Sequence, residues 1–563
     1  MNFMTGGIGS ESIAGPPVTG AQAGSMPLRR QSDLVIGLVS AISRGSAQIM
    51  LDIAAMEKLS GQSDTSIAMG GQVGSQIKMR VGQRWLVATV RTLALDVRSD
   101  SHVLADVDFL GEGEQEQLTG RIFRFRRGVT RFPVPGIEVQ PVSSADMAEI
   151  YAAHEETCVE IGTVYPTTAT RAALLVDSLL GKHFALLGST GTGKSTAAAL
   201  ILHRICDLSP EGHIVMIDPH GEYGAAFAGN GQVYNAGNLE LPYWLLNFEE
   251  HCEMLVTSKG PERAQDCDIL AKCLLAARSR NRLAEGIGRL TVDSPVPYLL
   301  SDLATILQNE MGKLDKGTNT LPYLRLRTRL DEIRSDPRFS FMFSGMLVAD
   351  SMQAFLAKIF RLPAHGKPIS IVDTSAMPSE ITHVVVSVLA RLIFDFAIWA
   401  RDEEQKPVLF VCEEAHRYIP SSTIGEGQSV RKILERIAKE GRKYGVSLGL
   451  ITQRPSDLAE GVLSQCGTII SMRLNNDRDQ NFVKAAMPEG SRGFLDAIPA
   501  LRNRECIVCG EGVTVPVRVA FDNLEPERRP ASADPVFSDL WRTSGGEDEI
   551  LERTINRWRN QGR

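Results

Sequence analysis

The sequence predicts an α/β protein whose core is a parallel sheet, with a small β-barrel before the sheet and a helical insertion within it. Three observations predict this fold class. Short β-like segments fill residues 31–165, apolar runs alternate with helical stretches from His183 onward, and a glycine-rich loop occupies residues 188–195. Apolar runs separated by helices are typical of a parallel sheet that is covered on both faces.

The length and composition indicate ordinary globular domains. The chain has 563 residues, which is long enough for about three domains. Hydrophobic residues make up 43% and charged residues 23%, which excludes collagenous, disordered and membrane-embedded classes. The formal net charge is -7, so the whole chain has no basic character and any nucleic acid must meet a local patch.

The sequence predicts a cytoplasmic protein that does not enter a membrane. Residues 1–30 are rich in Gly, Ser and Pro. They lack the apolar core of a signal peptide, and we expect them to be flexible. The longest apolar stretch, Val384–Trp399, contains Arg391 and Asp395, which favours a buried helix over a membrane span. Nine scattered cysteines favour reduced thiols in the cytosol.

The segment 31–165 is expected to form a small antiparallel β-barrel. Its β-like runs are separated by glycines and polar turns. They are Asp33–Val39, Ala47–Asp52, Gln76–Met79, Trp85–Leu93 and Val103–Phe109.

The later part of the chain is expected to form the parallel sheet from six apolar runs. They are Phe184–Leu187, Ile214–Asp218, Ile369–Asp373, Val408–Cys412, Ser447–Thr452 and Thr468–Met472. The stretch 251–362, between the second and third runs, reads mostly helical and is interpreted as an insertion into the α/β domain. Two β-like runs, Glu505–Gly510 and Val513–Phe521, precede a polar linker and an amphipathic helix near Glu547–Arg559.

These patterns predict a division of the chain into consecutive parts. The parts are a flexible segment (1–30), the barrel (31–165), the first part of the core (166–250), the helical insertion (251–362), the second part of the core (363–525), and a C-terminal linker and helix (526–563).

The glycine-rich loop GSTGTGKS has the pattern of a P-loop. It matches G-x-x-x-x-G-K-[ST] at every fixed position and lies between a predicted strand and a predicted helix. Its glycines let backbone N–H groups surround a phosphate at a helix N-terminus. Lys194 is expected to neutralise the β- and γ-phosphates, and Ser195 to bind Mg²⁺. The residues expected to contact ATP or GTP are Gly188, Ser189, Thr190, Gly191, Thr192, Gly193, Lys194, Ser195 and Thr196.

Two adjacent acids follow the apolar run 408–412. In open α/β sheets, ligands bind at the carboxyl ends of the strands, so Glu413 and Glu414 are expected to lie near the P-loop. Glu413 is expected to hold Mg²⁺, and Glu414 to orient and activate the attacking water. An acid pair after a strand is also typical of a solvated loop. Together with the P-loop, the pair predicts hydrolysis of the nucleotide.

Two further loops are expected at the same edge. Gln453 follows the strand 447–452 and has the amide that a sensor of the γ-phosphate needs, unless it faces solvent in a turn. Asp218, His220 and Glu222 follow the strand 214–218. Three ligands on one short loop make an awkward metal site. We expect these three residues instead to orient the Mg²⁺ shell or to couple the site to DNA.

Six motifs resemble those of HerA-type ATPases, a branch of the FtsK-HerA superfamily of DNA pumps. In chain order they are GSTGTGKS, IDPHGEY, PISIVDTSAMPSE, VLFVCEEAH, KEGRKYG and LITQRPSDL. The match covers nearly the whole chain. The resemblance implies an N-terminal HAS-type β-barrel and a RecA-like core that is interrupted by a helical bundle.

The resemblance also implies a homohexameric ring that threads double-stranded DNA and hydrolyses ATP at its subunit interfaces. Arg442 matches the position of the family's arginine finger, which completes the site of a neighbouring subunit. Lys443 and Arg473 are weaker candidates for this role. Alternatively, Arg442 caps the preceding helix or pairs with Glu440.

One position departs from the commonest pattern of the family. The magnesium-linked acid before the catalytic Glu is usually Asp, and here it is Glu413. The added methylene moves the carboxylate by about one C–C bond, which changes the detailed geometry of the metal site but not its role.

Two basic stretches are candidates for contact with DNA. The helix 430–441 contains Arg431, Lys432, Arg436 and Lys439 and is expected to form part of the ring's inner wall. Residues 121–132, RIFRFRRGVTRF, alternate arginine with phenylalanine. This stretch has three interpretations that the sequence leaves open: phosphate contacts, an edge strand with its polar face in water, or a surface for a partner protein.

The function predicted is that of an ATP-dependent double-stranded DNA translocase or helicase. No nuclease constellation stands outside the ATPase motifs, so we expect a separate nuclease or other effector as partner. The resemblance implies either a NurA-type nuclease in DNA end processing or an effector in antiviral defence. An alternative is a nucleotide-gated ring scaffold that regulates an effector with little translocation. A conjugation or secretion ATPase would dock on a membrane complex, and no feature indicates one.

Overall fold

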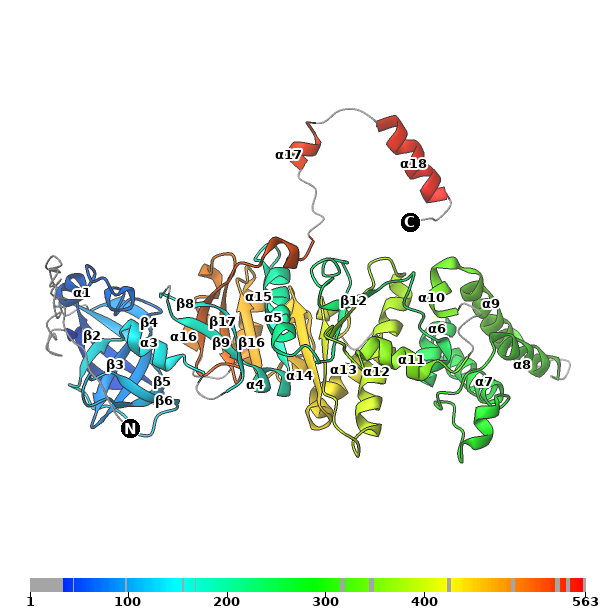
Figure 1. Cartoon of the computed structure of the whole chain (residues 1–563), viewed down its shortest axis with the longest axis horizontal. Helices are drawn as coiled ribbons and strands as arrows, with labels where there is room; N and C mark the ends of the chain where they lie inside the picture. The colour runs from blue at the N-terminus through cyan, green and yellow to red at the C-terminus, as the bar shows by residue number, and fades with distance from the viewer. Residues whose placement is uncertain are drawn as a thin grey trace, which may run out of the picture.

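The computed structural model places three regions along one long axis (Figure 1). The β-barrel lies at one end, the large sheet in the middle and a group of helices at the other end. The structure describes residues 34–43, 45–96, 99–153, 156–167, 169–313, 319–343, 349–422, 427–487, 492–531, 537–542 and 547–559. The predicted flexible segment 1–30 lies outside the described residues.

The predicted antiparallel barrel is confirmed. Six strands follow one another in the order β2-β1-β7-β3-β4-β5, and β2 pairs with β5 to close the ring, while β6 extends the sheet beside β5. In β2, buried and half-buried residues alternate, as a strand with one face in a barrel interior requires. The strands are β1 (Gly37–Ile42), β2 (Ser46–Asp52), β3 (Gln76–Val81), β4 (Arg84–Leu95), β5 (His102–Gln115), β6 (Ile122–Arg127) and β7 (Glu138–Pro141).

The arginine-rich stretch 121–132 contains the edge strand of this barrel sheet. β6 pairs only with β5. Ile122 and Phe125 are buried, whereas Phe123 is 46% exposed and Arg124 and Arg126 are exposed. The edge-strand interpretation is therefore confirmed, and contact with DNA or with a partner protein stays a prediction.

The middle region is an eleven-stranded sheet in the order β12-β13-β11-β14-β15-β10-β16-β17-β18-β8-β9. Neighbouring strands from β12 to β16 are parallel, and those from β16 to β9 are antiparallel. The strands are β8 (Cys158–Val164), β9 (Arg171–Leu175), β10 (Phe184–Leu187), β11 (Ile214–Asp218), β12 (Gly231–Tyr234), β13 (Ile369–Asp373), β14 (Val408–Cys412), β15 (Val446–Thr452), β16 (Thr468–Met472), β17 (Glu505–Gly510) and β18 (Val517–Phe521).

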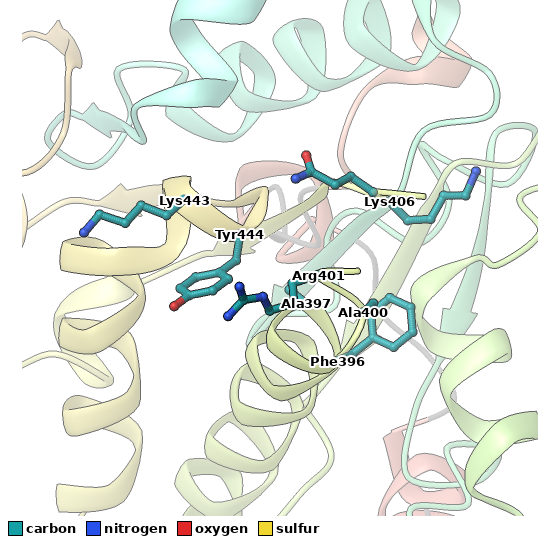
Figure 2. A pocket seen from close by; sticks show the side chains of 8 residues that line it. Phe396, Ala397, Ala400, Arg401, Lys406, Lys443 and Tyr444 are labelled. Atoms are coloured by element: carbon teal, nitrogen blue, oxygen red, sulfur yellow. The ribbon is translucent and has the colours of Figure 1, made fainter. Parts of the chain in front are cut away.

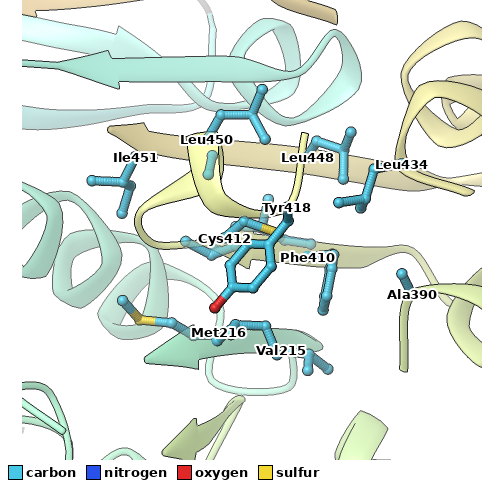
Figure 3. Packing of buried hydrophobic residues seen from close by; sticks show 14 of the residues in the cluster. Val215, Met216, Ala390, Phe410, Cys412, Tyr418, Leu434, Leu448, Leu450 and Ile451 are labelled. Carbon is cyan, nitrogen blue, oxygen red and sulfur yellow. The ribbon is translucent and has the colours of Figure 1, made fainter. Parts of the chain in front are cut away.

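All six predicted core strands are present. Every residue of β10, β11, β14, β15 and β16 is buried, because helices cover both faces of the sheet and leave no solvent side. Figure 3 shows Phe410 of β14 and Leu448 of β15 beside Leu434 of α13 (Gln428–Glu440) and Ala390 of α12 (Ser379–Trp399).

Helix α12 contains the longest apolar stretch of the chain. By length and composition alone it could cross a membrane, but 67% of its most apolar window is buried inside the protein. Its Arg391 forms an ion pair of 2.9 Å with the buried Glu250 of α6 (Phe248–Leu255). The helix therefore packs as a core helix in this fold, as its charges predict.

Helices fill the chain between β12 and β13. Helices α7, α8 and α9 pack against one another, at the end of the molecule opposite the barrel (Figure 1). Besides α6 they are α7 (Pro261–Arg278), α8 (Leu300–Gly312), α9 (Leu321–Ser335), α10 (Ser340–Phe343) and α11 (Met352–Phe360).

The first part of the polar linker after β18 lies on the surface of the core. The carboxylate of Asp207, in α5 (Lys194–Leu208), pairs with Arg528 at 2.5 Å, and the N–H of Ala531 donates to the carbonyl oxygen of Glu222 at 2.8 Å. Beyond this point α17 (Phe537–Leu540) and α18 (Glu547–Arg559) stand away from the body (Figure 1).

Candidate active site

All the predicted site residues except Arg442 gather at the carboxyl edge of the parallel strands. The P-loop follows β10, and Asp218 ends β11. Glu413 and Glu414 follow β14, and Gln453 follows β15. Because these strands are adjacent and parallel, their carboxyl ends bring the four loops together.

The P-loop has the backbone that its glycines allow. Gly191 and Gly193 have φ of +78° and +94°, values that side-chain-bearing residues rarely adopt. A Cβ atom on Gly188 would lie 2.9 Å from the Cβ of Met472. The Thr192 hydroxyl donates to the carbonyl oxygen of Ser189 at 2.8 Å. This loop leads into α5, whose first N–H groups can bind a phosphate.

Two of the predicted nucleotide contacts are placed at the start of α5. Lys194 is 9% exposed, and Ser195 is half-buried. Both lie where the helix N-terminus favours negative charge. The structure thus puts the lysine and the hydroxyl side by side at the helix N-terminus, and their contacts with a triphosphate and its cation stay a prediction.

Glu414 has a strained backbone conformation, and one of its carboxylate oxygens accepts a hydrogen bond while the other has no hydrogen-bond partner among the described residues. Its φ is +49°, which costs energy for any residue other than glycine. Its Oε1 accepts a hydrogen bond of 2.8 Å from Nε2 of Gln453, and its Oε2 lies 3.3 Å from Nδ1 of His416. His220 lies farther away, with Nε2 3.8 Å from Oε1. The carboxylate is 5% exposed and has a fixed direction, as a base for one water requires.

Gln453 connects the acid to the P-loop. The Thr190 hydroxyl donates to Oε1 of Gln453 at 2.6 Å, while Nε2 of Gln453 donates to Glu414. The amide therefore does not simply face solvent in a turn. A phosphate that entered the loop would meet Thr190 and Gln453 together, which is the arrangement that a sensor needs.

Glu413 is almost completely buried, and one of its two carboxylate oxygens is unpaired. It is 2% exposed, its Oε1 accepts a hydrogen bond of 3.1 Å from the Tyr223 hydroxyl, and its Oε2 has no hydrogen-bond partner among the described residues. Burial raises the pKa of Glu413 far above its usual range, and the charge of Asp218 adds to this, while Lys194 opposes it. A buried carboxylate with a free oxygen fits a site that takes a hard cation.

The Asp218 carboxylate organises its own loop. It accepts hydrogen bonds from the backbone N–H groups of His220, Gly221 and Tyr223 at 3.2, 2.8 and 2.9 Å. Burial raises its pKa, and these bonds oppose the rise. No group of three or more metal-ligating side chains occurs in the part of the chain that the structure describes. Asp218 therefore holds the backbone of its own loop. The expectation that this motif orients the Mg²⁺ shell or couples the site to DNA stays a prediction.

Arg442 lies at the opposite edge of the sheet. It belongs to η7 (Gly441–Tyr444), which precedes β15, whereas Gln453 follows β15. The strand has seven residues, so at about 3.3 Å per residue it separates Arg442 from its own P-loop by roughly 20 Å. Arg442 is exposed, and within the described ranges it has no ion pair; Glu440 instead pairs with Arg436.

A small hollow marks this opposite edge. Figure 2 shows Lys443 and Tyr444 together with Phe396, Arg401 and Lys406 around it. Its volume is about 20 Å³, which is room for a water molecule and not for a nucleotide. The weaker finger candidate Lys443 therefore also lies away from the P-loop of its own chain.

Arg473, the other weaker candidate, lies beside its own P-loop. It follows β16, and its carbonyl oxygen accepts a hydrogen bond of 2.9 Å from the N–H of Ser189. Its guanidinium donates to Asn503 and to the carbonyl oxygen of Leu501. This placement suits support of the loop in the same chain.

The basic helix α13 is mostly neutralised by neighbouring acids. Arg431 pairs with Glu435, Lys432 with Glu249 and Arg436 with Glu440. Lys439 is exposed and lines a cavity of about 640 Å³ with Arg431 and Arg478. That this helix lines a channel for DNA stays a prediction. Among the described residues, Lys439 is the basic side chain of the helix for which no ion pair is found.

Three site residues were not assigned from the sequence. They are Tyr223, His416 and Arg504. Tyr223 and His416 lie inside two of the motifs noted in the sequence, so their place in the chain could have marked them as site residues. Their hydrogen-bond and ion-pair partners, however, depend on the fold. Arg504 comes from a distant loop: its N–H donates to the carbonyl oxygen of Thr192 at 3.0 Å, and its Cγ lies 3.3 Å from where a Cβ on Gly193 would be.

Comparisons with known proteins agree with this site. The model of the family described as "Helicase HerA, central domain" matches residues 159–393. The DNA double-strand break repair helicase HerA of Pyrococcus furiosus is 26% identical over 518 residues, which covers 84% of this chain and 88% of that protein. The protein of the same name from Sulfolobus acidocaldarius is 24% identical over 435 residues, which covers 76% of this chain and 80% of the relative.

Solved structures also align with the chain. VirB4 of Thermoanaerobacter pseudethanolicus matches with a TM-score of 0.49 and 15% sequence identity, covering 66% of this chain and 98% of that chain.

Proposed function

We propose that this chain, which is a HerA-type P-loop ATPase, couples ATP hydrolysis to movement along double-stranded DNA. The observation that carries the proposal is the hydrogen-bonded line from Thr190 through Gln453 to Glu414. It joins the phosphate-binding loop to a directed carboxylate, which is the combination that hydrolysis requires.

The chemistry is assigned to residues of the carboxyl edge. The P-loop N–H groups and Lys194 bind the phosphates, and Lys194 offsets negative charge as the bond to the γ-phosphate breaks. Glu414 orients the attacking water and accepts its proton. Gln453 senses whether Thr190 is engaged by a phosphate. ATP is the nucleotide that we assign.

Ser195 and Glu413 are the residues that would hold Mg²⁺. Their oxygens suit a hard cation, and Oε2 of Glu413 lacks any other partner in the described residues. The bound ion supplies neutralisation of charge on the β- and γ-phosphates.

We propose a homohexameric ring in which Arg442 acts on the site of a neighbouring subunit. Its exposure and its place at the far edge of the sheet support this assignment, because a residue about 20 Å from its own P-loop can serve only another one. The relatives from Pyrococcus furiosus and Sulfolobus acidocaldarius are named as helicases of DNA double-strand break repair, and we extend action on DNA to this chain as a proposal.

The remaining assignments are part of the same proposal. The helices between β12 and β13 are assigned to a bundle inserted into a RecA-like core, and the barrel to the HAS type. We propose the division predicted from the sequence with one change: β8, which falls inside the predicted barrel segment 31–165, is counted in the core because it pairs with β18. The protein acts in the cytoplasm with a nuclease or other effector, in DNA end processing or antiviral defence.

The experiment that tests the proposal is ATP hydrolysis as a function of duplex DNA and salt. We expect duplex DNA to stimulate hydrolysis, and the DNA concentration for half-stimulation to rise steeply with salt. With about six phosphate contacts, affinity falls roughly 10³-fold between 50 and 200 mM salt. Hydrolysis that ignores DNA but responds to a protein partner would indicate the alternative, a nucleotide-gated scaffold that regulates an effector.

A further inference from the structure

Tyr223 lies against Glu413, one of the two side chains assigned to the metal. It is completely buried. Its hydroxyl donates to Oε1 of Glu413 at 3.1 Å. The phenol proton is therefore used toward one oxygen of this carboxylate.

The loop that carries Tyr223 is built to hold the phenol in place. Oδ2 of Asp218 accepts the N–H of Tyr223 at 2.9 Å. Gly221 has φ of +69°, and a Cβ atom there would approach both Oδ2 of Asp373 and Oγ of Ser375 to 3.3 Å. The loop thus has little room to shift, so the position of the hydroxyl is fixed by the backbone around it.

We propose that Tyr223 is a positioning residue for the metal site: it holds the carboxylate of Glu413 by one oxygen, so that the other oxygen is directed toward the cation position. This inference rests on the proposed Mg²⁺-dependent ATPase. A carboxylate ligates a hard cation through the lone pairs of its oxygens. The bond from Tyr223 engages Oε1 of Glu413 and leaves the unpartnered Oε2 for that purpose.

The alternative, a merely structural tyrosine, accounts for less of the geometry. A buried phenol needs one hydrogen-bond partner, and the partner of Tyr223 is a carboxylate oxygen of the acid assigned to the metal. Without the phenol, Oε1 of Glu413 would lose this hydrogen bond, and both carboxylate oxygens would be unpaired in a buried place. Removal of such an outer partner typically lowers metal affinity by about 10- to 100-fold.

The test is Tyr223→Phe, measured by the binding of a fluorescent ATP analogue during a Mg²⁺ titration. Phenylalanine keeps the ring and removes only the hydroxyl. We expect the Mg²⁺ concentration needed for tight binding to rise about 10-fold or more, while nucleotide affinity in EDTA and the melting temperature stay close to those of the wild type. The assay uses neither DNA nor hydrolysis.

The matched control is Tyr243→Phe. Tyr243 is also buried, and its hydroxyl donates to the carbonyl oxygen of Tyr298 at 2.5 Å, in the helical part of the chain. This variant loses a comparable hydrogen bond and should keep the wild-type response to Mg²⁺.

A wild-type response in Tyr223→Phe would overturn the inference and leave the ATPase proposal standing. An equal loss of nucleotide affinity with Mg²⁺ and in EDTA would also overturn it. Wild-type binding that ignores Mg²⁺ would instead contradict the metal site of the proposed function, and the inference with it.

Discussion

Glu414→Gln is expected to bind ATP as tightly as the wild type and to hydrolyse it about 10²- to 10⁴-fold more slowly, because a general base contributes that much to the rate. Glutamine has nearly the same shape and can still accept the hydrogen bond from Gln453 at its amide oxygen. The loss is therefore confined to the charge and the proton-accepting oxygen. Single-turnover hydrolysis of labelled ATP, together with equilibrium binding, measures the two quantities separately.

The control for this variant is Glu460→Gln. Glu460 is exposed and opens the short helix α14 (Glu460–Leu463), near the same edge of the sheet. Removal of its charge should leave the rate within about twofold of the wild type, since exposed charges contribute little. If Glu414→Gln retained wild-type turnover, Glu414 would not be the base, and the role of the acid pair would need another assignment.

The second large effect is expected in mixed assemblies of two inactive variants. Lys194→Ala should lose ATP binding, because Lys194 is the buried cation at the start of the P-loop helix. Arg442→Ala should bind ATP and fail to hydrolyse it, since the finger stabilises charge that develops in the transition state. Arg442 is exposed, so its replacement should leave stability unchanged.

Mixing the two variants should restore hydrolysis. An interface is complete when an Arg442→Ala subunit supplies the P-loop and a Lys194→Ala subunit supplies the arginine, which in a random equal mixture applies to about one quarter of the interfaces. ATP turnover after subunit exchange is the measurement. Lys443→Ala serves as the control, because it should hydrolyse ATP without a partner variant. If the mixture stayed inactive, the trans role of Arg442 would be wrong.

The parallel core could be predicted closely from the sequence. Five of the six predicted core strands, including Phe184–Leu187 and Val408–Cys412, have the observed bounds. Strands that are buried on both faces must be continuously apolar, so their ends are visible in the sequence as the first polar residues. The ends of these apolar runs also predicted the positions of Glu413, Glu414 and Gln453, because site residues in such sheets come directly after the carboxyl ends of the strands.

Pairing between distant segments could not be predicted. β8 and β9 lie beyond β18 in the core sheet, although they come before β10 in the chain and within or next to the predicted barrel. Nothing local in Cys158–Val164 distinguishes a barrel strand from a strand that pairs with Val517–Phe521. Register between such distant segments is decided by tertiary packing.

The site shows the same limit at the level of single side chains. Most basic residues of α13 pair with neighbouring acidic residues. One of these acids, Glu249, is distant from the helix in the sequence. The role of Tyr223 depends on the fold in the same way, since Glu413 lies 190 positions later in the chain. A charge run or a motif predicts which residues are present, whereas their partners come from the folded chain.

The most direct test of the central claim is displacement of the third strand from a DNA triplex. The account predicts that the wild type with ATP and Mg²⁺ releases the third strand after a delay that grows with the length of duplex to be crossed. Lys194→Ala should release none, because it cannot bind ATP. Duplex-stimulated hydrolysis that left the third strand in place at every length would contradict movement along DNA.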